Sequence, residues 1–581
     1  MSTNSKTEEL RRQILNRQLV VLNERRFFPD YALKQVVTRD AVTGVIMESG
    51  IERHDHTTVI DRILGGAQKI FCILVCIRHV NSITILLRCG IQDAKLALSR
   101  EELQSDSIGL ESHLADEFYQ QQWSFIAPIF KSGVQKLPKS CILPFKEERV
   151  LAEGGCGALL RVVLYRSHQE LVSSDHESGD TVVVARKRIK RISAISRPEK
   201  DFENERGPLE FLRQLGHPHI IELLGSYHQE DDYNFFFPLA DGSLQDLFEK
   251  GHQHFKIGPE GFYSSIVGLS SAINHIHNFT CESGGTNDNY KGYHRDLKPG
   301  NILIQQGKLI ISDFGLSKFK EDAFPSSTIH RFGTEAYLPP EACDLSPEST
   351  FEDQTVGRGV DIWAFGCILA EIATYLLLRP EGVGEFRTKR TTRVHPNVVD
   401  NSFHAHNQVK EEVNEWLKHL EELAERDSQI SRLVQLARKT LIPDRKERPT
   451  AQVVLDEVSA LHPENAEYMK LLAWKQPPGQ KQEVSQTDKY QDVDMILGPS
   501  PDTLPPAPSG LRPPRVPNRR PAAQSSFLSE PSPVLGGSSL LSEPSPVLGG
   551  SSLLSEPSPL LGGSSFMSEQ SQLWKRNPGS H

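Results

Sequence analysis

The feature that most constrains this chain is a pair of short charged motifs separated by an apolar run. HRDLKPGN occupies residues 294–301, and DFG follows at residues 313–315. Either motif alone could arise in any polar loop, where a tripeptide carries little information. Their joint occurrence on the two sides of ILIQQGKLIIS makes chance negligible and indicates a site built for chemistry.

These motifs resemble the catalytic loop and the metal-binding motif of the eukaryotic protein kinase family. The resemblance implies that Asp296 accepts or orients the proton of a substrate hydroxyl and that Lys298 lies beside the transferred phosphate. It also implies that Asn301 and Asp313 are ligands of Mg²⁺, so ATP and Mg²⁺ are the expected cofactors. Together with Lys298, the run GTEAY, which places Thr334 in the substrate-facing loop, is typical of the serine/threonine type.

The segment AEGGCGAL, residues 152–159, resembles the loop that covers the phosphates of ATP in this family. Gly154 and Gly157 match its second and third glycines, whereas Ala152 stands in place of the first. A glycine-rich loop alone is often only a hairpin turn. The interpretation gains weight from Lys187 in VARK, which resembles the lysine that contacts the α- and β-phosphates. The basic run ARKRIKR could otherwise be a nuclear signal.

We expect Lys187 to have an acidic partner on the next helix, FENERGPLEFLRQL. Glu203, Glu205 and Glu210 are the candidates, and Glu205 has the spacing from the apolar residues that kinases show. The alternative is a solvated acid on an exposed helix face, and Pro208 leaves the register of this helix open.

The resemblance implies further roles around this centre. FFFPLADGSL matches the hinge, with Phe237 as gatekeeper and Ala240 offering backbone groups to adenine. Two contacts are expected in the scaffold: Glu341 with Arg448, and Asp361 with the catalytic loop. An activation segment is expected between DFG and PPE, where a phosphate could meet Arg295; its candidate acceptors are Ser326, Ser327 and Thr328.

The expected fold class is α+β, a bilobal kinase fold over residues 145–462. After Pro138, short β-branched runs predict a small antiparallel sheet, and helical periods over 202–215 and 244–461 predict a helix-rich second lobe. Residues 1–138 are predicted to form a helical domain, which contains a helix over 7–23 with Thr7 as its N-cap and a buried helix at IFCILVCI. Loose similarity to a group of fungal kinases implies that this domain packs near the small lobe.

Residues 476–581 are rich in Pro, Ser and Gly and contain a thirteen-residue repeat. Its copies begin at Ser525, Ser538 and Ser551, with a decayed fourth at Ser564. Prolines and paired glycines in every copy oppose a continuous helix or strand, so we expect disorder. Three serines precede proline and could accept proline-directed phosphorylation, although a neutral spacer explains the repeats equally well: Ser532, Ser545 and Ser558.

Charge and composition restrict the partners. A net charge of −10 disfavours nucleic acid and membrane surfaces, because both attract basic proteins. The start MSTNSKTEEL lacks the apolar core of a signal peptide, and the longest apolar run is too short for a membrane span. The eight cysteines show no metal-binding spacing. We therefore expect a cytoplasmic or nuclear protein whose partners are protein substrates, with further protein partners for the helical domain and the tail.

Two functions fit these observations. The first is an active serine/threonine kinase, and the second is a pseudokinase scaffold that acts only by binding. Ala152 and the proline in the helix of Glu205 favour the scaffold. Pseudokinases usually lose the base, the metal-binding aspartate or the lysine, and this chain retains Asp296, Asp313 and Lys187, so activity is the stronger hypothesis.

Overall fold

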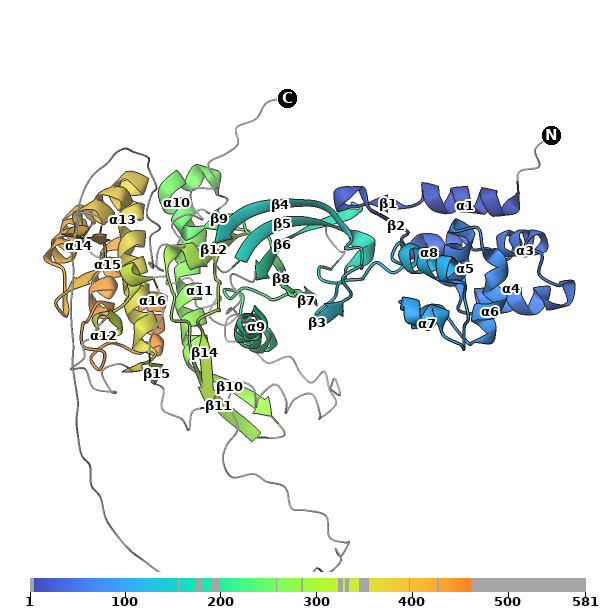
Figure 1. Cartoon of the computed structure of the whole chain (residues 1–581). Helices are drawn as coiled ribbons and strands as arrows, with labels where there is room; N and C mark the ends of the chain where they lie inside the picture. The colour runs from blue at the N-terminus through green and yellow to red at the C-terminus, as the bar shows by residue number, and fades with distance from the viewer. Residues whose placement is uncertain are drawn as a thin grey trace, which may run out of the picture. The chain divides into compact units, whose positions relative to one another are not determined.

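The computed structural model describes residues 5–460 of the 581, with short internal gaps (Figure 1). The predicted tail with its repeats and Ser-Pro sites, and also Ser326 and Ser327, lie outside the described residues. The gaps are at residues 155–156, 174–178, 190–197, 256, 258, 284–285, 322–327, 330–333, 344–354, 396–397 and 426–427.

The N-terminal part is a cluster of short helices around one buried helix. That helix, α5 (Gln68–Cys76), is buried over Ile70–Cys76, which confirms the prediction made from its apolar run. Seven helices accompany it: α1 (Lys6–Asn16), α2 (Asp30–Val36), α3 (Arg39–Glu48), α4 (His56–Leu64), α6 (Ile83–Arg88), α7 (Arg100–Gln104) and α8 (Ser112–Gln122).

The first helix is shorter than predicted. Ser5, and not Thr7, is its N-cap, and Thr7 lies inside the first turn. The helix buries only Leu10 and Ile14, one turn apart, and it ends at Asn16. Beyond it, β1 (Leu19–Val20) pairs with β2 (Arg26–Phe27). The apolar residues no longer recur at helical spacing there, so strand pairing replaces the hydrogen bonds of the helix.

The small lobe is a six-stranded sheet in the order β3-β7-β8-β6-β5-β4 (Figure 1). The predicted antiparallel pairing holds except at one edge, where β3 runs parallel to β7. Residues 134–137, which we assigned to the helical domain, therefore belong to this sheet. The strands are β3 (Val134–Leu137), β4 (Phe145–Gly154), β5 (Gly157–Tyr165), β6 (Thr181–Ile189), β7 (Gly225–Gln229) and β8 (Asp232–Pro238).

Helix α9 (Pro198–Leu215) packs on this sheet through an aromatic contact. The rings of Phe202 and Phe235 stack with their centroids 4.7 Å apart. Pro208 lies inside the helix, and the helix continues through it to Leu215.

The large lobe is helical and is built around α13 (Gly359–Lys389), so the expected bilobal fold is confirmed. Arg379, at a φ of 59°, and the following Pro380 divide α13 into two helical segments. Of the described helices, α13 alone is long and apolar enough to cross a membrane, and 89% of its most apolar window is buried inside the protein. The other helices are α10 (Leu244–Lys250), α11 (Pro259–His277), α12 (Pro340–Cys343), α14 (Glu411–Leu423), α15 (Gln429–Thr440) and α16 (Ala451–Ala460).

Short strands carry the two sequence motifs. The HRD loop leads into the hairpin of β12 (Ile302–Gln305) and β13 (Lys308–Ile311), and DFG follows β13. β14 (Lys318–Glu321) pairs with β11 (Thr286–Tyr293), so the segment after DFG lies beside the strand that precedes HRD. The remaining strands are β9 (Gly242–Ser243), β10 (Phe279–Ser283), β15 (Thr328–Ile329), β16 (Thr355–Val356), β17 (Thr392–His395), β18 (Val398–Asp400), β19 (His404–Ala405) and β20 (Gln408–Val409).

Aromatic contacts join the N-terminal domain to the small lobe. The ring of Phe27 meets that of His168 edge to face, with centroids 4.5 Å apart. The hydroxyl of Tyr165 donates a hydrogen bond of 2.7 Å to the carbonyl oxygen of Val20. Burial lowers the pKa of His168 to about 4, so this ring stays neutral at physiological pH. The implied packing of this domain near the small lobe agrees with these contacts.

Candidate active site

One buried carboxylate, that of Asp361, binds the backbone of the loop that carries HRD. Asp361 accepts hydrogen bonds of 2.8 Å from the backbone N–H groups of His294 and Arg295, which confirms the predicted bracing. The Nε2 atom of His277 lies 2.9 Å from Asp361 Oδ2, a contact that the sequence did not predict. Burial tends to raise the pKa of Asp361, but the hydrogen bond and the charge interaction with His277 lower it below its usual value.

Asp296 lies at the centre of a hydrogen-bond network. Lys298 Nζ donates to Asp296 Oδ2 over 2.8 Å, and Asn301 Nδ2 donates to the same oxygen over 2.9 Å. The other oxygen, Oδ1, accepts from Thr334 N at 3.0 Å and from Thr334 Oγ1 at 2.9 Å. The carboxylate is therefore oriented on both sides, and Thr334 from the expected substrate-facing loop touches it directly.

Asn301 is oriented so that its side-chain oxygen has no partner. Its Nδ2 group donates to the carbonyl oxygen and the carboxylate of Asp296, which turns Oδ1 the other way. Asn301 is 1% exposed, and its Oδ1 has no hydrogen-bond partner among the described residues. A buried acceptor without a donor is costly unless a ligand satisfies it, and an amide oxygen is a ligand that Mg²⁺ accepts.

Lys187 links the sheet, helix α9 and the DFG motif. Its Nζ atom lies 2.7 Å from Glu205 Oε1 and 3.0 Å from Asp313 Oδ1. Of the three acidic candidates on α9, Glu205 is the one that reaches it. The other two pair along the helix surface, Glu203 with Arg206 and Glu210 with Arg213.

Attraction between Lys187 and the neighbouring carboxylates shifts the pKa values of this cluster. The positive charge of Lys187 lowers the pKa of Asp313 to about 2, so this carboxylate is ionised at neutral pH. Burial alone would lower the pKa of Lys187, but the carboxylates of Asp313 and Glu205 raise it well above its usual value. Burial raises the pKa of Glu205. The arrangement therefore keeps a lysine cation beside a carboxylate that can bind a metal ion.

Asn301 and Asp313 carry side-chain oxygen atoms of the kind that Mg²⁺ prefers as ligands. In the described parts of the chain, no three His, Cys, Asp or Glu side chains are grouped to hold a metal ion. Mg²⁺ is usually bound by one or two protein groups together with substrate phosphates and water, so Asn301 and Asp313 are candidate ligands.

The glycine-rich hairpin joins β4 to β5, with Gly154 paired opposite Gly157; residues 155–156 lie outside the described part. A side chain at Gly157 would collide with the carbonyl oxygen of Arg188, so this position requires glycine. Ala152 is 4% exposed and lies in β4 opposite Leu159. The residue that replaces the first glycine is therefore a buried part of the strand.

The expected hinge follows β8. Phe237 is nearly buried and pairs with Ala185 of β6, the strand of Lys187. Ala240 lies between β8 and β9, and its neighbour Asp241 donates a backbone hydrogen bond of 2.8 Å to the carbonyl oxygen of Ile304. This bond fixes the hinge to the β12 strand beside the HRD loop.

The predicted contact between Glu341 and Arg448 is confirmed and is a bidentate ion pair. Arg448 Nη1 lies 2.6 Å from Glu341 Oε1, and Arg448 Nη2 lies 2.7 Å from Glu341 Oε2. Arg448 is 6% exposed, so the pair is shielded from solvent.

A second buried network, which the sequence did not predict, supports the loop of Thr334. Glu371 of α13 is fully buried and accepts a hydrogen bond of 2.9 Å from the hydroxyl of Tyr337. Arg387 Nε lies 2.8 Å and Arg390 Nη2 lies 2.9 Å from Glu371 Oε1. Both arginines lie at the end of the helix that carries Glu371, and Tyr337 precedes Glu371 by 34 residues, so only the repetition of charge on a buried helix could have hinted at the network.

Comparison with known proteins shows which sequences this chain resembles. Residues 171–458 match the model of the protein kinase domain. The chain is 32% identical over 168 residues to the serine/threonine-protein kinase crk1 of Schizosaccharomyces pombe, covering 28% of this chain and 43% of that protein. It is 31% identical over 174 residues to the serine/threonine-protein kinase RAD53 of Saccharomyces cerevisiae, covering 29% of this chain and 19% of that protein.

A third relative is the serine/threonine-protein kinase Sgk1 of Fundulus heteroclitus, 26% identical over 263 residues, which are 45% of this chain and 53% of that protein. The chain thus spans about half or less of the length of the curated relatives it matches. The family match begins after β4 and β5, so the glycine-rich hairpin lies outside it.

Proposed function

We propose that this chain, which belongs to the eukaryotic protein kinase family, is of the serine/threonine type and transfers the γ-phosphate of ATP to serine or threonine hydroxyls of protein substrates. One observation carries the proposal. Lys187, Glu205 and Asp313 form a connected ion cluster, and Asp296, Asn301 and Lys298 form a second hydrogen-bonded cluster. Between them, the two clusters offer a base, metal ligands and cations for the phosphates.

In this mechanism Asp296 orients the substrate hydroxyl and accepts its proton. The hydroxyl oxygen forms a bond to the γ-phosphorus while the bond from that phosphorus to the β–γ bridging oxygen breaks, and ADP leaves. Lys298, which is hydrogen-bonded to Asp296, would neutralise charge on the phosphoryl oxygens. A positioned general base contributes about 10²- to 10⁴-fold to the rate in enzymes generally.

Lys187 would bind the α- and β-phosphates, and Glu205 would hold its ammonium in place. The backbone around Ala240 would meet the adenine, and the hairpin of Ala152, Gly154 and Gly157 would cover the phosphates. Asn301 Oδ1 and Asp313 would hold Mg²⁺. When bound, that ion would offset the negative charge of the phosphates.

The two features that favoured the pseudokinase alternative are Ala152 and the proline in α9, and neither separates Lys187 from Glu205. Ala152 still pairs with Leu159 directly after a shift in the register of β4, and α9 passes through Pro208 with Glu205 still 2.7 Å from Lys187. The base, the metal-binding aspartate and the lysine are all present, so nothing in the centre favours a purely binding role.

The test is a labelling assay with matched variants. Full-length protein is incubated with Mg²⁺ and radiolabelled ATP, with and without a generic basic protein substrate, beside Asp296→Asn. Asp456→Asn, at an exposed position of α16, is the control for loss of a carboxylate. Label on serine or threonine that disappears only in Asp296→Asn supports the proposal. Equal labelling by Asp296→Asn and the wild type would refute the assigned role of Asp296.

A further inference from the structure

A single turn of 3₁₀ helix, η8 (Glu335–Tyr337), directly follows the residue that touches the proposed base. The backbone N–H and the hydroxyl of Thr334 both donate to Asp296 Oδ1. Tyr337 N donates a hydrogen bond of 2.9 Å to the carbonyl oxygen of Thr334, and the Tyr337 hydroxyl donates to Glu371. The turn is therefore anchored at one end to Asp296 and at the other end to the large lobe.

Glu335 is the residue of this turn whose side chain faces solvent. Ala336 and Tyr337 are buried, whereas Glu335 is exposed. Its backbone carbonyl oxygen accepts a hydrogen bond of 3.2 Å from Leu338 N, so the main chain is fixed. Its carboxylate has no hydrogen bond or ion pair with any residue that the structure describes.

The surroundings of Cys343 show a negative field beside this turn. Loss of hydration raises the pKa of the Cys343 thiol to about 11, and three nearby negative charges contribute to the rise: Glu335, Asp400 and Glu341. The last two are each held in an ion pair, with Lys410 and Arg448 respectively. Of the three carboxylates, that of Glu335 alone has no cationic partner within the described part of the chain.

The buried network beneath this turn does not neutralise Glu335. Arg387 and Arg390 both bind Glu371. Burial opposes the charge of Arg387, but the carboxylates of Glu371 and Glu249 raise its pKa. Two cations are therefore balanced by two carboxylates, and the network has no net charge that would offset Glu335.

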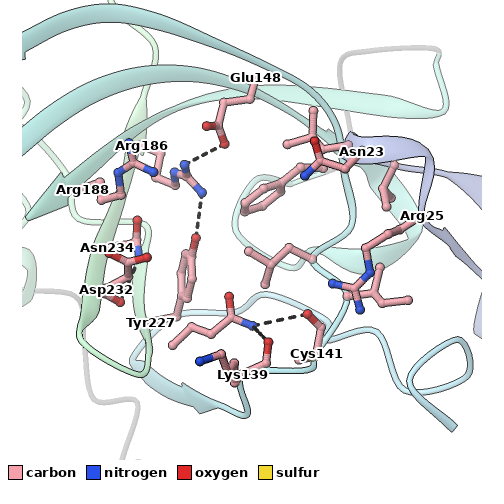
Figure 2. Close-up of a pocket in the computed structure, with 16 residues that line it drawn as sticks. Asn23, Arg25, Lys139, Cys141, Glu148, Arg186, Arg188, Tyr227, Asp232 and Asn234 are labelled. Carbon is pink, nitrogen blue, oxygen red and sulfur yellow. Dashed lines mark hydrogen bonds and ion pairs between the residues drawn. The ribbon is translucent and has the colours of Figure 1, made fainter. Parts of the chain in front are cut away.

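The charged side chains beside the small-lobe sheet show how charge is usually held in this protein. Figure 2 shows Arg186 between Glu148 and Tyr227; its Nη2 atom lies 2.6 Å from Glu148 Oε2, and its Nη1 atom lies 2.9 Å from the Tyr227 hydroxyl. Lys139, which lines the same hollow, forms an ion pair of 3.1 Å with Glu230. These cations are already occupied, in contrast to the carboxylate in the turn.

The acceptor of the phosphate must lie close to this turn. Asp296 takes the proton of the acceptor hydroxyl in the proposed mechanism, and Glu335 is one residue away from the groups of Thr334 that touch Asp296. Consecutive Cα atoms are about 3.8 Å apart, and an extended peptide advances about 3.3 Å per residue. A long basic side chain within about three residues of the acceptor can therefore reach the Glu335 carboxylate.

We propose that Glu335 selects substrates that carry an arginine or lysine within three residues of the acceptor serine or threonine. The inference rests on the proposed function and names the class of substrate for that site. A guanidinium or ammonium group of the substrate forms a charge-assisted hydrogen bond with the exposed carboxylate, and an acidic residue at the same position is repelled.

The test is a peptide scan with the full-length protein, Mg²⁺ and ATP. The parent peptide has one serine in an alanine and glycine background, and a single arginine is moved through the three positions on each side of it. The kcat/KM of each peptide is divided by that of the parent, which removes differences in overall activity. We expect arginine in at least one position to raise kcat/KM about twofold to fivefold, as for an exposed ion pair, and glutamate in that position to lower it.

Three variants assign the preference to Glu335. Glu335→Gln should remove the advantage of the arginine peptide, and Glu335→Lys should reverse it, so that the glutamate peptide becomes the better substrate. Asp456→Lys makes the same charge reversal at an exposed position of α16 and should keep the wild-type preference.

An arginine advantage that survives in Glu335→Gln would overturn the proposal. Equal kcat/KM for all peptides would overturn it as well, because it would mean that a cation of the protein itself occupies Glu335. Transfer of phosphate to the parent peptide supports the proposed function, so a flat scan contradicts this inference alone, whereas no transfer by the wild type contradicts both.

Discussion

Replacing Glu371 by glutamine should destabilise the large lobe severely. The side chain is fully buried, and it is the common partner of Arg387, Arg390 and Tyr337. Arg390 is 1% exposed and lies over the rings of Phe386 and Phe403, so water cannot replace the lost carboxylate. Breaking a buried ion pair by removing one partner generally costs about 3–5 kcal/mol.

The pKa of Glu371 gives an independent magnitude. Burial opposes ionisation, but Arg387 and Arg390 lower this pKa from 4.5 to about 2. At roughly 1.4 kcal/mol per pKa unit, the shift corresponds to about 3 kcal/mol of folding free energy at neutral pH. Because the folded-state pKa is the lower one, this stability is present above pH 4.5 and is lost as the pH falls towards 2.

The assay is urea denaturation of the full chain, followed by tryptophan fluorescence, to which Trp363 and Trp416, buried in this lobe, contribute two of the five tryptophans. The free energy of unfolding should fall by about 3 kcal/mol in Glu371→Gln at pH 7, and the gap to the wild type should narrow by roughly 1.5 kcal/mol at pH 3.5. Glu457→Gln breaks an exposed pair with Lys439 and should have little effect. A gap that stays the same at both pH values would refute the electrostatic argument.

Two further predictions concern the active site. Glu205→Gln should lower kcat/KM for ATP by about tenfold or more, because the Lys187 ammonium loses a charged partner. Glu203→Gln is the control and should leave steady-state kinetics unchanged, because the ion pair of Glu203 lies on the helix surface. Equal effects of the two variants would contradict the assignment of Glu205. Thr334→Val removes the hydroxyl that donates a hydrogen bond to Asp296. With a peptide substrate, kcat should fall several-fold while KM for ATP changes little. A change confined to KM for ATP would contradict this role and indicate that Thr334 acts in nucleotide binding.

Local sequence was sufficient for the parts of the site that lie within a few residues of one another. The positions of Asp296, Lys298 and Asn301 follow from one loop, so their hydrogen bonds involve neighbours in the chain. The choice of Glu205 depended on its spacing from apolar residues, which resembles that of kinases, and the geometry agrees with it although Pro208 lies in the same helix.

Contacts between distant segments were predicted only where the resemblance to kinases implied them, as for Glu341 with Arg448. His277 ends α11 and reaches Asp361 across 84 residues, and nothing in its local sequence separates it from an ordinary core histidine. The Glu371 network likewise depends on how α13 packs. The strand β3 was missed because VQKL is short and gains its partner, β7, from a segment about 90 residues later.

The parallel pairing of β3 with β7 has a practical consequence for anyone who shortens this protein. A fragment that begins where the family match begins, at residue 171, would lack β3, β4 and β5 and would leave unpaired edges on what remains of the sheet. Even a fragment that begins just after Pro138 would lack β3, so the edge of β7 would be unpaired. Uncovered strand edges recruit other chains, so such fragments are expected to aggregate, and the smallest well-behaved piece should begin before Val134.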